Sequence, residues 1–399
     1  MDRLYLNNPY IKTFNADIIE FINSDGKLLV VLNNTAFYPD GGGQPSDMGM
    51  IGECNVSYVY EENNIIYHVV DRCPMSYKNV SCIIDWNRRF DNMQQHAGQH
   101  ILSAAFEKLL NGSTVGFHLG VQYVTVDISI DSLSDTDAKR VEQMANDIVF
   151  HNLPIRYHYP DCEGLAKFNL RKEPTVEENI RIVEIDGFDF SPCCGTHPSF
   201  TGEIGLIKIR KWEKSKDNIR VEFVCGVRAL CDYSWKSDYI NEISSLLSIK
   251  DIQVLETAKK TISELRGANK EIKLLTDKVL TYEASDLYNN STALKGVRII
   301  KQLFTGRDFK EIISLANKLA KYPSSIALLG LKSENAQMIF TRSTDVNIKI
   351  NELFKEVLPL INGKGGGNPQ SAQGGGPDIS NLESALESGY IILKNRHLK

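Results

Sequence analysis

The sequence predicts a multidomain α+β protein, and three observations lead to this fold class. The chain has 399 residues, which is too long for one ordinary hydrophobic core and suits two to four domains. Strand patterns fill its first part, and helix patterns begin near residue 90. A heptad pattern then precedes a final stretch in which strands and helices alternate. We therefore predict a small antiparallel β-barrel (1–88), an α+β domain (89–233), a helical or coiled-coil linker (234–290) and a C-terminal α/β domain with a glycine-rich loop (291–399).

The predicted β-barrel depends on short strand-like segments that are separated by turn residues. The segments rich in β-forming residues are 27–32, 55–60, 64–70 and 79–85. Clusters of Asn, Asp, Gly and Pro at 23–26 and 39–43 are typical turn sequences. Such regular spacing of strands and turns favours a small antiparallel barrel.

The second region begins with a helix and continues as a mixture of helices and strands. Within 91–110, the apolar residues Ile101, Ala104, Ala105 and Leu109 fall at helical spacing. A strand at 123–130 and a helix at 136–152 follow, and strand-like segments at 181–184 and 204–209 complete the region. We expect one α+β unit that ends near residue 233.

The third region carries apolar residues three and four positions apart, the pattern of a coiled coil. The pattern comprises Leu255, Ala258, Ile262, Leu265, Asn269, Ile272, Thr276 and Val279. A polar Asn269 at one core position is the kind of residue that fixes register. The segment is only a few heptads long, so an intramolecular helical hairpin and a dimer-forming coil both fit it.

The last region alternates strand and helix patterns, which predicts a compact α/β domain. Strands are expected at 297–303, 325–331 and 337–341, and helices at 309–322, 350–361 and 381–395. Between the last two helices lies a segment with two triple glycines, at 365–367 and 374–376. Lys, Gln and Pro interrupt this segment, so it does not have the composition of a flexible linker.

Charge and apolar content limit the classes of function. The net charge of −5 argues against binding nucleic acid over the whole surface, so any such contact needs a local basic face. Apolar runs such as 28–32 are far shorter than a membrane span, and residues 1–10 lack the apolar core of a signal peptide. We expect a cytoplasmic protein with no membrane contact, whose eight cysteines are thiols.

Two short motifs point to a metal site. His96 and His100 are four residues apart, so on a helix both imidazoles lie on one face. Cys193 and His197 have the same spacing around Gly195, which permits a tight turn. One thiolate and three imidazoles suit a borderline-soft divalent ion, with zinc the first choice. Spacing alone leaves open whether Cys193 or Cys194 is the ligand, and whether the metal is structural or catalytic.

These motifs, in this order, resemble the editing domain that alanyl-tRNA synthetases share with AlaX proteins, and more distantly that of threonyl-tRNA synthetases. The similar segments are 37–49, 95–102, 116–127, 193–205 and 220–230. The glycine-rich segment 365–376 is similar to the signature of the synthetase C-terminal domain, which helps to hold tRNA and contributes to dimer formation. The similarity begins almost at residue 1, so we expect no class II aminoacylation domain before it. The resemblance therefore implies a free-standing, long-form AlaX-type editing protein that acts in trans.

The resemblance implies an ATP-independent hydrolase that maintains translation fidelity by deacylating mischarged tRNA(Ala). A pocket for alanine rejects an added hydroxyl only about a hundredfold, so a second site has to remove serine, and in some family members glycine. We expect Ser-tRNA(Ala) as the substrate, with Gly-tRNA(Ala) as a second one, and the C-terminal half as a candidate homodimer contact. The alternatives are a non-catalytic zinc-containing tRNA-binding protein and a metal hydrolase that acts on another aminoacyl ester.

The resemblance selects the thiolate ligand, and the chemistry of the other residues suggests their roles. The family often has Gly where Cys194 stands, so Cys193 is the matching ligand, and Gln99 beside the metal is the candidate catalytic residue. The zinc ligands are then His96, His100, Cys193 and His197. The substrate-binding candidates are Gly41, Gly42, Gly43, Gln44 and Thr114. The tRNA-binding candidates are Lys364, Gly365, Gly366, Gly367, Gly374, Gly375 and Gly376, although Asn368 occupies a position that is usually basic.

Overall fold

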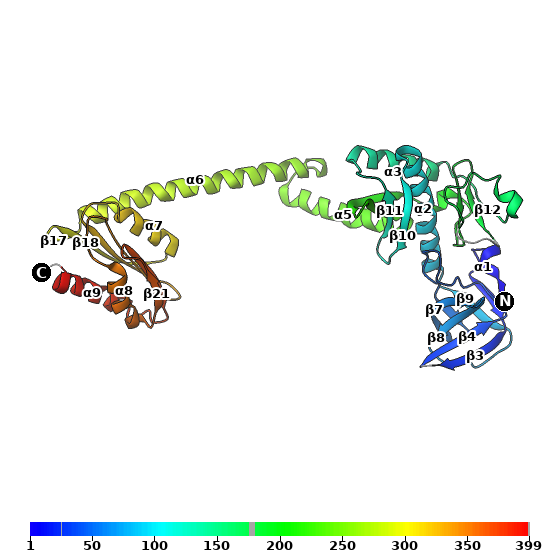
Figure 1. Ribbon diagram of the computed structural model, residues 1–399, viewed down its shortest axis with the longest axis horizontal. Helices are drawn as coiled ribbons and strands as arrows, with labels where there is room; N and C mark the ends of the chain where they lie inside the picture. The colour runs from blue at the N-terminus through cyan, green and yellow to red at the C-terminus, as the bar shows by residue number, and fades with distance from the viewer. Residues whose placement is uncertain (25, 175–179, 398–399) are drawn as a thin grey trace. The chain divides into compact units, whose positions relative to one another are not determined.

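The structure is a computed structural model that describes residues 1–399 except 25, 175–179 and 398–399 (Figure 1). The predicted turn at 23–26 contains Asp25 and so lies partly outside the described residues. The chain forms two compact units, Met1–Asp251 and Ile252–Lys399, and each has its own hydrophobic core. The structure confirms a mixed α+β protein with several sheets. The finer division into four domains stays a prediction.

The first unit begins with a seven-stranded antiparallel sheet. The order of its strands is β2 (Thr13–Ala16), β9 (Val80–Ile84), β6 (Gly49–Ile51), β7 (Cys54–Glu62), β8 (Ile65–Val70), β4 (Lys27–Leu32) and β3 (Ile18–Ser24). The edge strands β2 and β3 follow each other in the chain with only Asp17 between them. The sheet therefore has to curl until its edges approach each other, which produces a β half-barrel close to the predicted barrel (Figure 1).

Short elements and apolar side chains complete this β half-barrel. β1 (Asp2–Arg3) pairs in parallel with β5 (Asn34–Thr35), and the helix α1 (Leu4–Asn7) follows β1. Alternate residues of the long strands point inward, so Val30, Leu32, Val59 and Ile66 are buried together with Phe37. The predicted strands of this region are confirmed because their alternating apolar residues form this core.

The second half of the first unit is built around the helix α2 (Trp86–Leu110). Asp85 caps its beginning, since the Asp85 side chain accepts a hydrogen bond from the backbone N–H of Arg88. Asn111 ends the helix in the left-handed conformation, with φ 53°. The helix therefore starts five residues before the predicted position 91, because the cap lies directly after β9.

α2 packs with α3 (Asp135–Phe150) on a four-stranded antiparallel sheet. The sheet order is β10 (Ser113–Leu119), β11 (Val124–Ser129), β16 (Asn218–Cys225) and β15 (Ile207–Ser215). A second, three-stranded sheet contains β12 (Ile155–His158), β13 (Ile182–Ile185) and β14 (Asp189–Pro192). The short helix α4 (Cys162–Leu165) and the helix α5 (Gly226–Leu247) complete the unit. Apolar residues of α2, α3 and both sheets form one core, which holds α2 rigidly.

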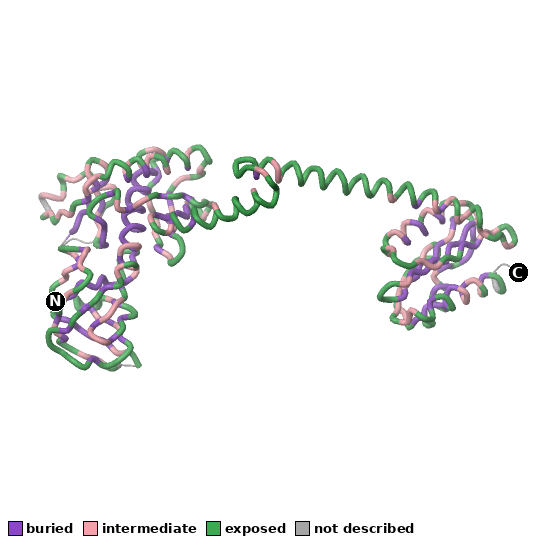
Figure 2. The backbone as a smooth tube through the Cα atoms, turned by 180° about the vertical axis from the view of Figure 1, so that it is seen from behind, coloured by how far each residue is buried: buried purple, intermediate pink, exposed green. Residues whose placement is uncertain are grey.

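The second unit begins with the long helix α6 (Val254–Asn289), which contains the predicted heptad. Its seam is not covered in this chain, because Leu265, Ile272 and Val279 are each 60% exposed (Figure 2). Only Val254, Leu280 and Ala284 of this helix are buried. The predicted helix is confirmed, and a dimer-forming seam stays a prediction.

A six-stranded mixed sheet forms the centre of the second unit. Its order is β17 (Thr292–Leu294), β18 (Val297–Thr305), β19 (Ser325–Lys332), β20 (Ala336–Arg342), β22 (Ser371–Gly376) and β21 (Lys364–Gly367). β18 and β19 are parallel and are joined by the crossover helix α7 (Phe309–Leu319), whereas the other pairs are antiparallel.

Helices cover both faces of this sheet. Ala327, Leu329 and Leu331 pack with α6 and α7, while Ile326 and Leu328 pack with α8 (Ile350–Val357) and α9 (Leu382–Ile392). Burial on both faces explains why β19 is apolar along nearly its whole length. The predicted α/β character of this region is therefore confirmed.

The sequence predicted a glycine-rich loop in this region, and the structure corrects this prediction, because the segment forms a β-hairpin. Lys364–Gly367 and Ser371–Gly376 are the paired strands β21 and β22. A Cβ on Gly365 would lie 2.4 Å from the carbonyl oxygen of Gln373, and one on Gly367 would lie 2.1 Å from that of Ser371. Only glycine allows the two backbones to approach so closely, so here the triple glycine indicates strand pairing rather than a flexible loop.

Candidate metal centre

α2 supplies the first half of the centre. His96 and His100 lie one helical turn apart, and their ring centroids are 5.3 Å from each other. Both are buried, as is every residue of α2 from Met93 to Phe106. Because α2 is fixed by its packing on both sides, the two imidazoles are held at one end of the core.

The loop after β14 supplies the second half. Cys193 and His197 lie on either side of Gly195, whose added Cβ would be only 2.3 Å from Cε1 of His96. Glycine is therefore required at 195 for the loop to pack against α2. Arg181 donates from Nη1 to the carbonyl oxygens of Cys193 (3.0 Å) and Gly195 (2.7 Å), which fixes the loop.

The four side chains meet at one point. The Cys193 Sγ lies 3.4 Å from Nε2 of His96 and 3.3 Å from Nε2 of His197. The ligand atoms of all four residues, His100 included, lie within 4.8 Å of one another. Tetrahedral zinc with ligand bonds of about 2.0–2.3 Å separates its ligand atoms by under roughly 4 Å. The cluster therefore fits one ion of this kind with a small contraction.

Gln44 forms a hydrogen bond with Nδ1 of His96, the ring nitrogen that does not contact Cys193. The Gln44 Oε1 lies 3.0 Å from Nδ1 of His96 and accepts the backbone N–H of Thr196 at 3.0 Å. The Gln44 Nε2 donates to Oγ1 of Thr196 at 2.8 Å, so both ends of the amide are assigned by their partners. An oxygen at Nδ1 requires the proton there, which leaves the lone pair of Nε2 free to bind a metal. Gln44 is buried and supports a ligand, although we expected it to contact substrate.

Asp189 lies near Nδ1 of His100. Its Oδ2 lies 3.6 Å from Nδ1 of His100, a distance for an ion pair rather than a hydrogen bond. Arg171 donates to Asp189 from Nε at 2.9 Å, and the hydroxyl of Ser191 donates to it at 2.8 Å. Asp189 is therefore a buried carboxylate beside an imidazole nitrogen that has no hydrogen-bond partner among the described residues, and a carboxylate is a common outer partner of a metal-binding histidine.

The electrostatics of the cluster favour a bound cation. Burial acts to raise the pKa of the Cys193 thiol, but the three neighbouring imidazoles outweigh burial and hold this pKa well below its usual range. Burial lowers the pKa of His197 to about 3, which keeps this imidazole neutral. Burial also acts to lower the pKa of His100, yet Cys193 and Asp189 raise it overall. A thiolate beside a neutral imidazole is the protonation state that binds a borderline-soft metal.

The centre opens into a cleft of about 450 Å³, which we call the metal cleft. His96, His100 and Cys193 contribute to its wall, together with the predicted residues Gln99 and Thr114. Gln99 donates to the Ser103 hydroxyl at 2.7 Å, and the Thr114 hydroxyl lies 2.7 Å from the same oxygen. The structure therefore places Gln99 and Thr114 beside the candidate metal ligands in one polar network.

The glycine motif at 41–44 is a tight turn next to this cleft. Gly41 and Gln44 exchange both backbone hydrogen bonds, at 3.2 and 3.0 Å, and Gly42 and Gly43 have φ of 57° and 81°. Positive φ at both central residues is the requirement of a type I′ turn. A Cβ on Gly43 would lie 2.6 Å from the Phe117 ring, so the turn packs tightly against β10. Gly42 contributes to the cleft wall.

The remaining predicted residues lie in the other unit. Lys364, Gly365 to Gly367 and Gly374 to Gly376 belong to the β21–β22 hairpin, and their role in tRNA binding stays a prediction. Sequence reasoning missed Asp189, Thr196 and Arg181 as residues of the centre. A local signal exists only for Thr196, which lies within the ligand motif; the contacts of the other two depend on the fold.

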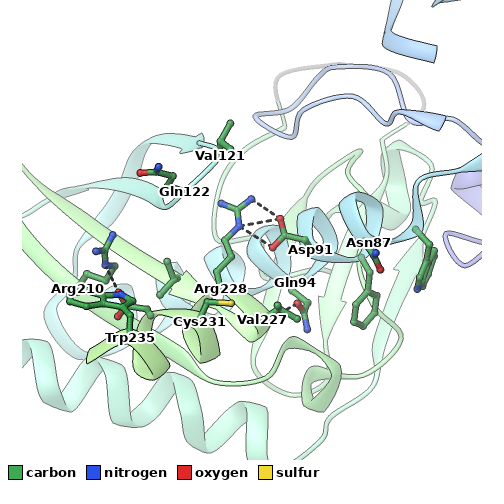
Figure 3. Close-up of a pocket in the computed structure, with 14 residues that line it drawn as sticks. Asn87, Asp91, Gln94, Val121, Gln122, Arg210, Val227, Arg228, Cys231 and Trp235 are labelled. Atoms are coloured by element: carbon green, nitrogen blue, oxygen red, sulfur yellow. Dashed lines mark hydrogen bonds and ion pairs between the residues drawn. The ribbon is translucent and has the colours of Figure 1, made fainter. Parts of the chain in front are cut away.

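A second cavity of about 800 Å³ lies on another side of α2, and we call it the α2–α5 cavity (Figure 3). Its arginines are paired: Arg228 contacts both carboxylate oxygens of Asp91, and its Nη1 donates to the carbonyl of Gly120 at 2.6 Å. Arg210 is paired with Glu222 and Asp232.

None of the helices in the described ranges is long and apolar enough to cross a membrane.

Comparison with known proteins agrees with the two regions of resemblance. Residues 180–222 match the model of the threonyl and alanyl tRNA synthetase second additional domain, and residues 296–389 match that of the DHHA1 domain. A solved structure, the C-Ala domain from Aquifex aeolicus alanyl-tRNA synthetase, is 19% identical and covers 27% of this chain and 99% of that chain. Its TM-score of 0.25 is too low to carry an argument about the fold.

Relatives that match nearly the whole of this chain identify the family. The alanine–tRNA ligase of Methanobrevibacter smithii is 32% identical over 98% of this chain, and that of Pyrococcus abyssi is 29% identical over 98%. This chain spans less than half of those ligases, 46% and 43% of their lengths. The alanyl-tRNA editing protein AlaX-L of Pyrococcus horikoshii is 31% identical over 94% of both chains. The chain therefore belongs to the family of AlaX-L alanyl-tRNA editing proteins.

Proposed function

We propose that this protein is a trans-editing deacylase that hydrolyses the ester of mischarged tRNA(Ala), with Ser-tRNA(Ala) as its main substrate and Gly-tRNA(Ala) as a second one. One observation carries the proposal: three of the four candidate ligands contribute to the wall of an open cleft, beside the polar side chains of Gln99 and Thr114. A purely structural zinc is normally enclosed by its four ligands, whereas a catalytic one is reached by substrate. Family membership supports the alanyl-tRNA editing role.

The residues present suit zinc as the cofactor, held by His96, His100, Cys193 and His197. When bound, such an ion polarises a carbonyl or a water molecule for ester hydrolysis. The chain's own residues prepare the site: Gln44 sets the tautomer of His96, and Asp189 lies beside Nδ1 of His100. Both partners are buried, so the ligand geometry is fixed before substrate arrives.

Selection of serine follows from the polar network in the cleft. Thr114 and Gln99 share the Ser103 hydroxyl, and Thr114 is only partly buried at the cleft wall. A seryl hydroxyl can join this network, whereas the methyl group of alanine cannot. Such a site favours a seryl over an alanyl ester, because the hydroxyl adds hydrogen bonds that a methyl group does not make. This network accounts for serine as a substrate and not for glycine. We therefore assign Thr114 to hydroxyl recognition and Gln99 to positioning of the ester.

The test is release of serine from Ser-charged tRNA(Ala) by the purified, zinc-loaded protein, measured beside Ala-charged tRNA(Ala). A Cys193→Ala/His197→Ala variant serves as the control. We expect serine to be released, alanine to be spared, and release to disappear in the variant. A folded, zinc-loaded protein that releases no serine would exclude this function and favour a non-catalytic tRNA-binding role. Release of other aminoacyl esters instead would identify a hydrolase of different specificity.

A further inference from the structure

Ser103 is a buried hydroxyl in an apolar part of α2. Every residue from Ile101 to Phe106 is at most 2% exposed, and Ser103 is the one polar side chain in this range. A buried hydroxyl costs free energy unless it forms hydrogen bonds. Gln99 Nε2 donates to the Ser103 oxygen at 2.7 Å, and the Thr114 hydroxyl lies at the same distance. Both partners line the metal cleft, so Ser103 links two residues of its wall.

A β-bulge brings Thr114 to this position. The register of β10 on β11 shifts between Thr114 and Gly116. Val115 between them is the extra residue, and it is 54% exposed. A bulge of this kind changes the direction in which neighbouring side chains point, and bulges are frequent next to active sites. The contact between Thr114 and Ser103 is therefore built into the strand and the helix that carry them.

The hydrogen bonds through Ser103 have to run in one direction. A hydroxyl has one hydrogen to donate, and the Ser103 oxygen already accepts from the amide nitrogen of Gln99. The buried Ser103 hydrogen then needs an acceptor, and among the described residues the Thr114 oxygen is within reach. The chain of hydrogen bonds therefore runs from Gln99 through Ser103 to Thr114, which leaves the hydrogen of the Thr114 hydroxyl free.

This direction determines what the two wall residues offer to a ligand. Ser103 uses the nitrogen of the Gln99 amide, so the carbonyl oxygen, an acceptor, is left for the cleft. Thr114 offers a hydroxyl hydrogen, which is a donor. An ammonium group has only donors and pairs with the carbonyl oxygen. The reverse direction would present the NH2 group of Gln99, which an ammonium group cannot use.

We propose that Ser103 fixes this direction and thereby makes the metal cleft specific for esters with a free α-ammonium group, which donates to the carbonyl oxygen of Gln99. N-acylated esters, such as those of a peptidyl-tRNA, lack this cation and are rejected. Thr114 at the same time donates to the oxygen of a seryl hydroxyl. Ser103 is thus a positioning residue that acts through Gln99 and Thr114. The inference rests on the proposed function for the identity of the ester, but binding alone can test it.

The experiment measures binding of hydrolysis-resistant ligands to the zinc-loaded full chain by calorimetry. The ligands are 3′-amino-3′-deoxyadenosine acylated through an amide bond with serine, glycine or N-acetylserine. We expect the wild type to bind the seryl ligand roughly tenfold or more tightly than the N-acetylseryl ligand, as for a hydrogen bond to a charged group. Its preference for the seryl over the glycyl ligand should be about fivefold, as for one neutral hydrogen bond.

Variants of Ser103 then test whether this residue sets both preferences. Ser103→Ala should bring both close to one, because it releases the Gln99 amide and the Thr114 hydroxyl, whereas Ser103→Thr retains the hydroxyl and should restore them. Ser325→Ala is the matched control, since Ser325 is also 1% exposed but belongs to the second unit. Zinc content and melting temperature show that each variant is folded with its metal centre intact.

Two results would overturn the inference: equal binding of the seryl and N-acetylseryl ligands by the wild type, or unchanged preferences in folded Ser103→Ala. If Ser103→Ala does not fold, Gln99→Met decides, because it lacks the carbonyl oxygen, and a retained preference for the free amine would overturn the inference. A wild type with both preferences that releases no serine from Ser-tRNA(Ala) would contradict the proposed function and leave the role of Ser103 standing. Equally fast hydrolysis of Ser-tRNA(Ala) and N-acetyl-Ser-tRNA(Ala) would have the opposite meaning.

Discussion

The metal cleft and the α2–α5 cavity are both lined by α2, yet their polar groups are arranged differently. In the α2–α5 cavity, Asp91 and the Gly120 carbonyl occupy Nε, Nη1 and Nη2 of Arg228. At the metal cleft, two donors of Arg181 have no hydrogen-bond partner among the described residues, and Nδ1 of His100 and Nδ1 of His197 are also buried without one there. The described residues satisfy the first set, whereas they leave donors of the second set without a partner.

The difference shows how a binding site can be separated from a structural cavity of similar or larger size. The α2–α5 cavity is larger, at about 800 Å³ against about 450 Å³ for the metal cleft, so volume does not identify the site. Unsatisfied buried groups cost free energy in the folded protein, and a ligand that satisfies them recovers it. On this ground we place function at the metal cleft and assign the charges of the other cavity to stability.

Loss of a metal ligand should have the largest effect. We expect His100→Ala to lose its bound zinc and to slow serine release by more than about a hundredfold, since loss of even an outer partner costs 10- to 100-fold. Metal content is measured by atomic emission, and the rate from Ser-tRNA(Ala). The exposed His151, at the end of α3, provides the matched control His151→Ala. Equal activity of the two variants would contradict the assignment.

Removal of the outer partner Gln44 should have the next largest effect. Without its oxygen, Nδ1 of His96 loses the acceptor that fixes the ring tautomer. We expect Gln44→Ala to weaken zinc binding about 10- to 100-fold in a chelator competition. Gln122→Ala is the control, because Gln122 is an exposed glutamine of the α2–α5 cavity. Unchanged zinc affinity in Gln44→Ala would show that the contact is only structural.

In the α2–α5 cavity, Arg228→Ala should change stability and not activity. The variant leaves Asp91 partly buried without its partner, so we expect the free energy of unfolding to fall by about 1–3 kcal/mol. Denaturant titration measures the loss, and serine release is compared per folded molecule. A lower rate without a loss of stability would mean that this cavity takes part in function, and the contrast between the two regions would fail.

The smallest expected effect is the loss of stability that acid causes through Asp232 of the α2–α5 cavity. Burial acts to raise the pKa of Asp232, but Lys236 and Arg210 outweigh burial and lower it below the ordinary 3.8. A lowered carboxyl pKa contributes stability that is complete above the unfolded value and is lost as pH falls through the folded one. Asp232→Asn should therefore flatten the decline of the unfolding midpoint below about pH 4. An unchanged decline would exclude Asp232 as its source.

Local patterns predicted the elements and the ligand motifs. The alternating strands of the β half-barrel, the span of α2 and the heptad of α6 follow from residue spacing, since each pattern is complete within a few turns. His96, His100, Cys193 and His197 were recognisable because each pair shares a four-residue spacing. Their side chains together already suggested one metal site, and the family resemblance then selected Cys193 rather than Cys194 as the thiolate ligand.

Long-range contacts account for what the sequence did not predict. Gln44 reaches His96 across 52 positions, and nothing near Gln44 in the chain indicates that its amide faces a ligand. Arg181 precedes β13 as an ordinary polar residue, and its unpaired donors appear only when the Cys193 loop covers it. The β21–β22 hairpin was missed because glycine usually weakens strands, and only the close backbone approach shows why it is used here.

The central claim is that one ion held by these four residues makes the metal cleft a deacylase. The most direct test removes metal from the purified protein with a chelator and then titrates zinc back while serine release from Ser-tRNA(Ala) is measured. We predict that activity is lost on removal and returns fully at one equivalent of zinc per chain, and that a His197→Ala variant shows no return. Full activity of the metal-free protein, or recovery in that variant equal to the wild type, would contradict the claim.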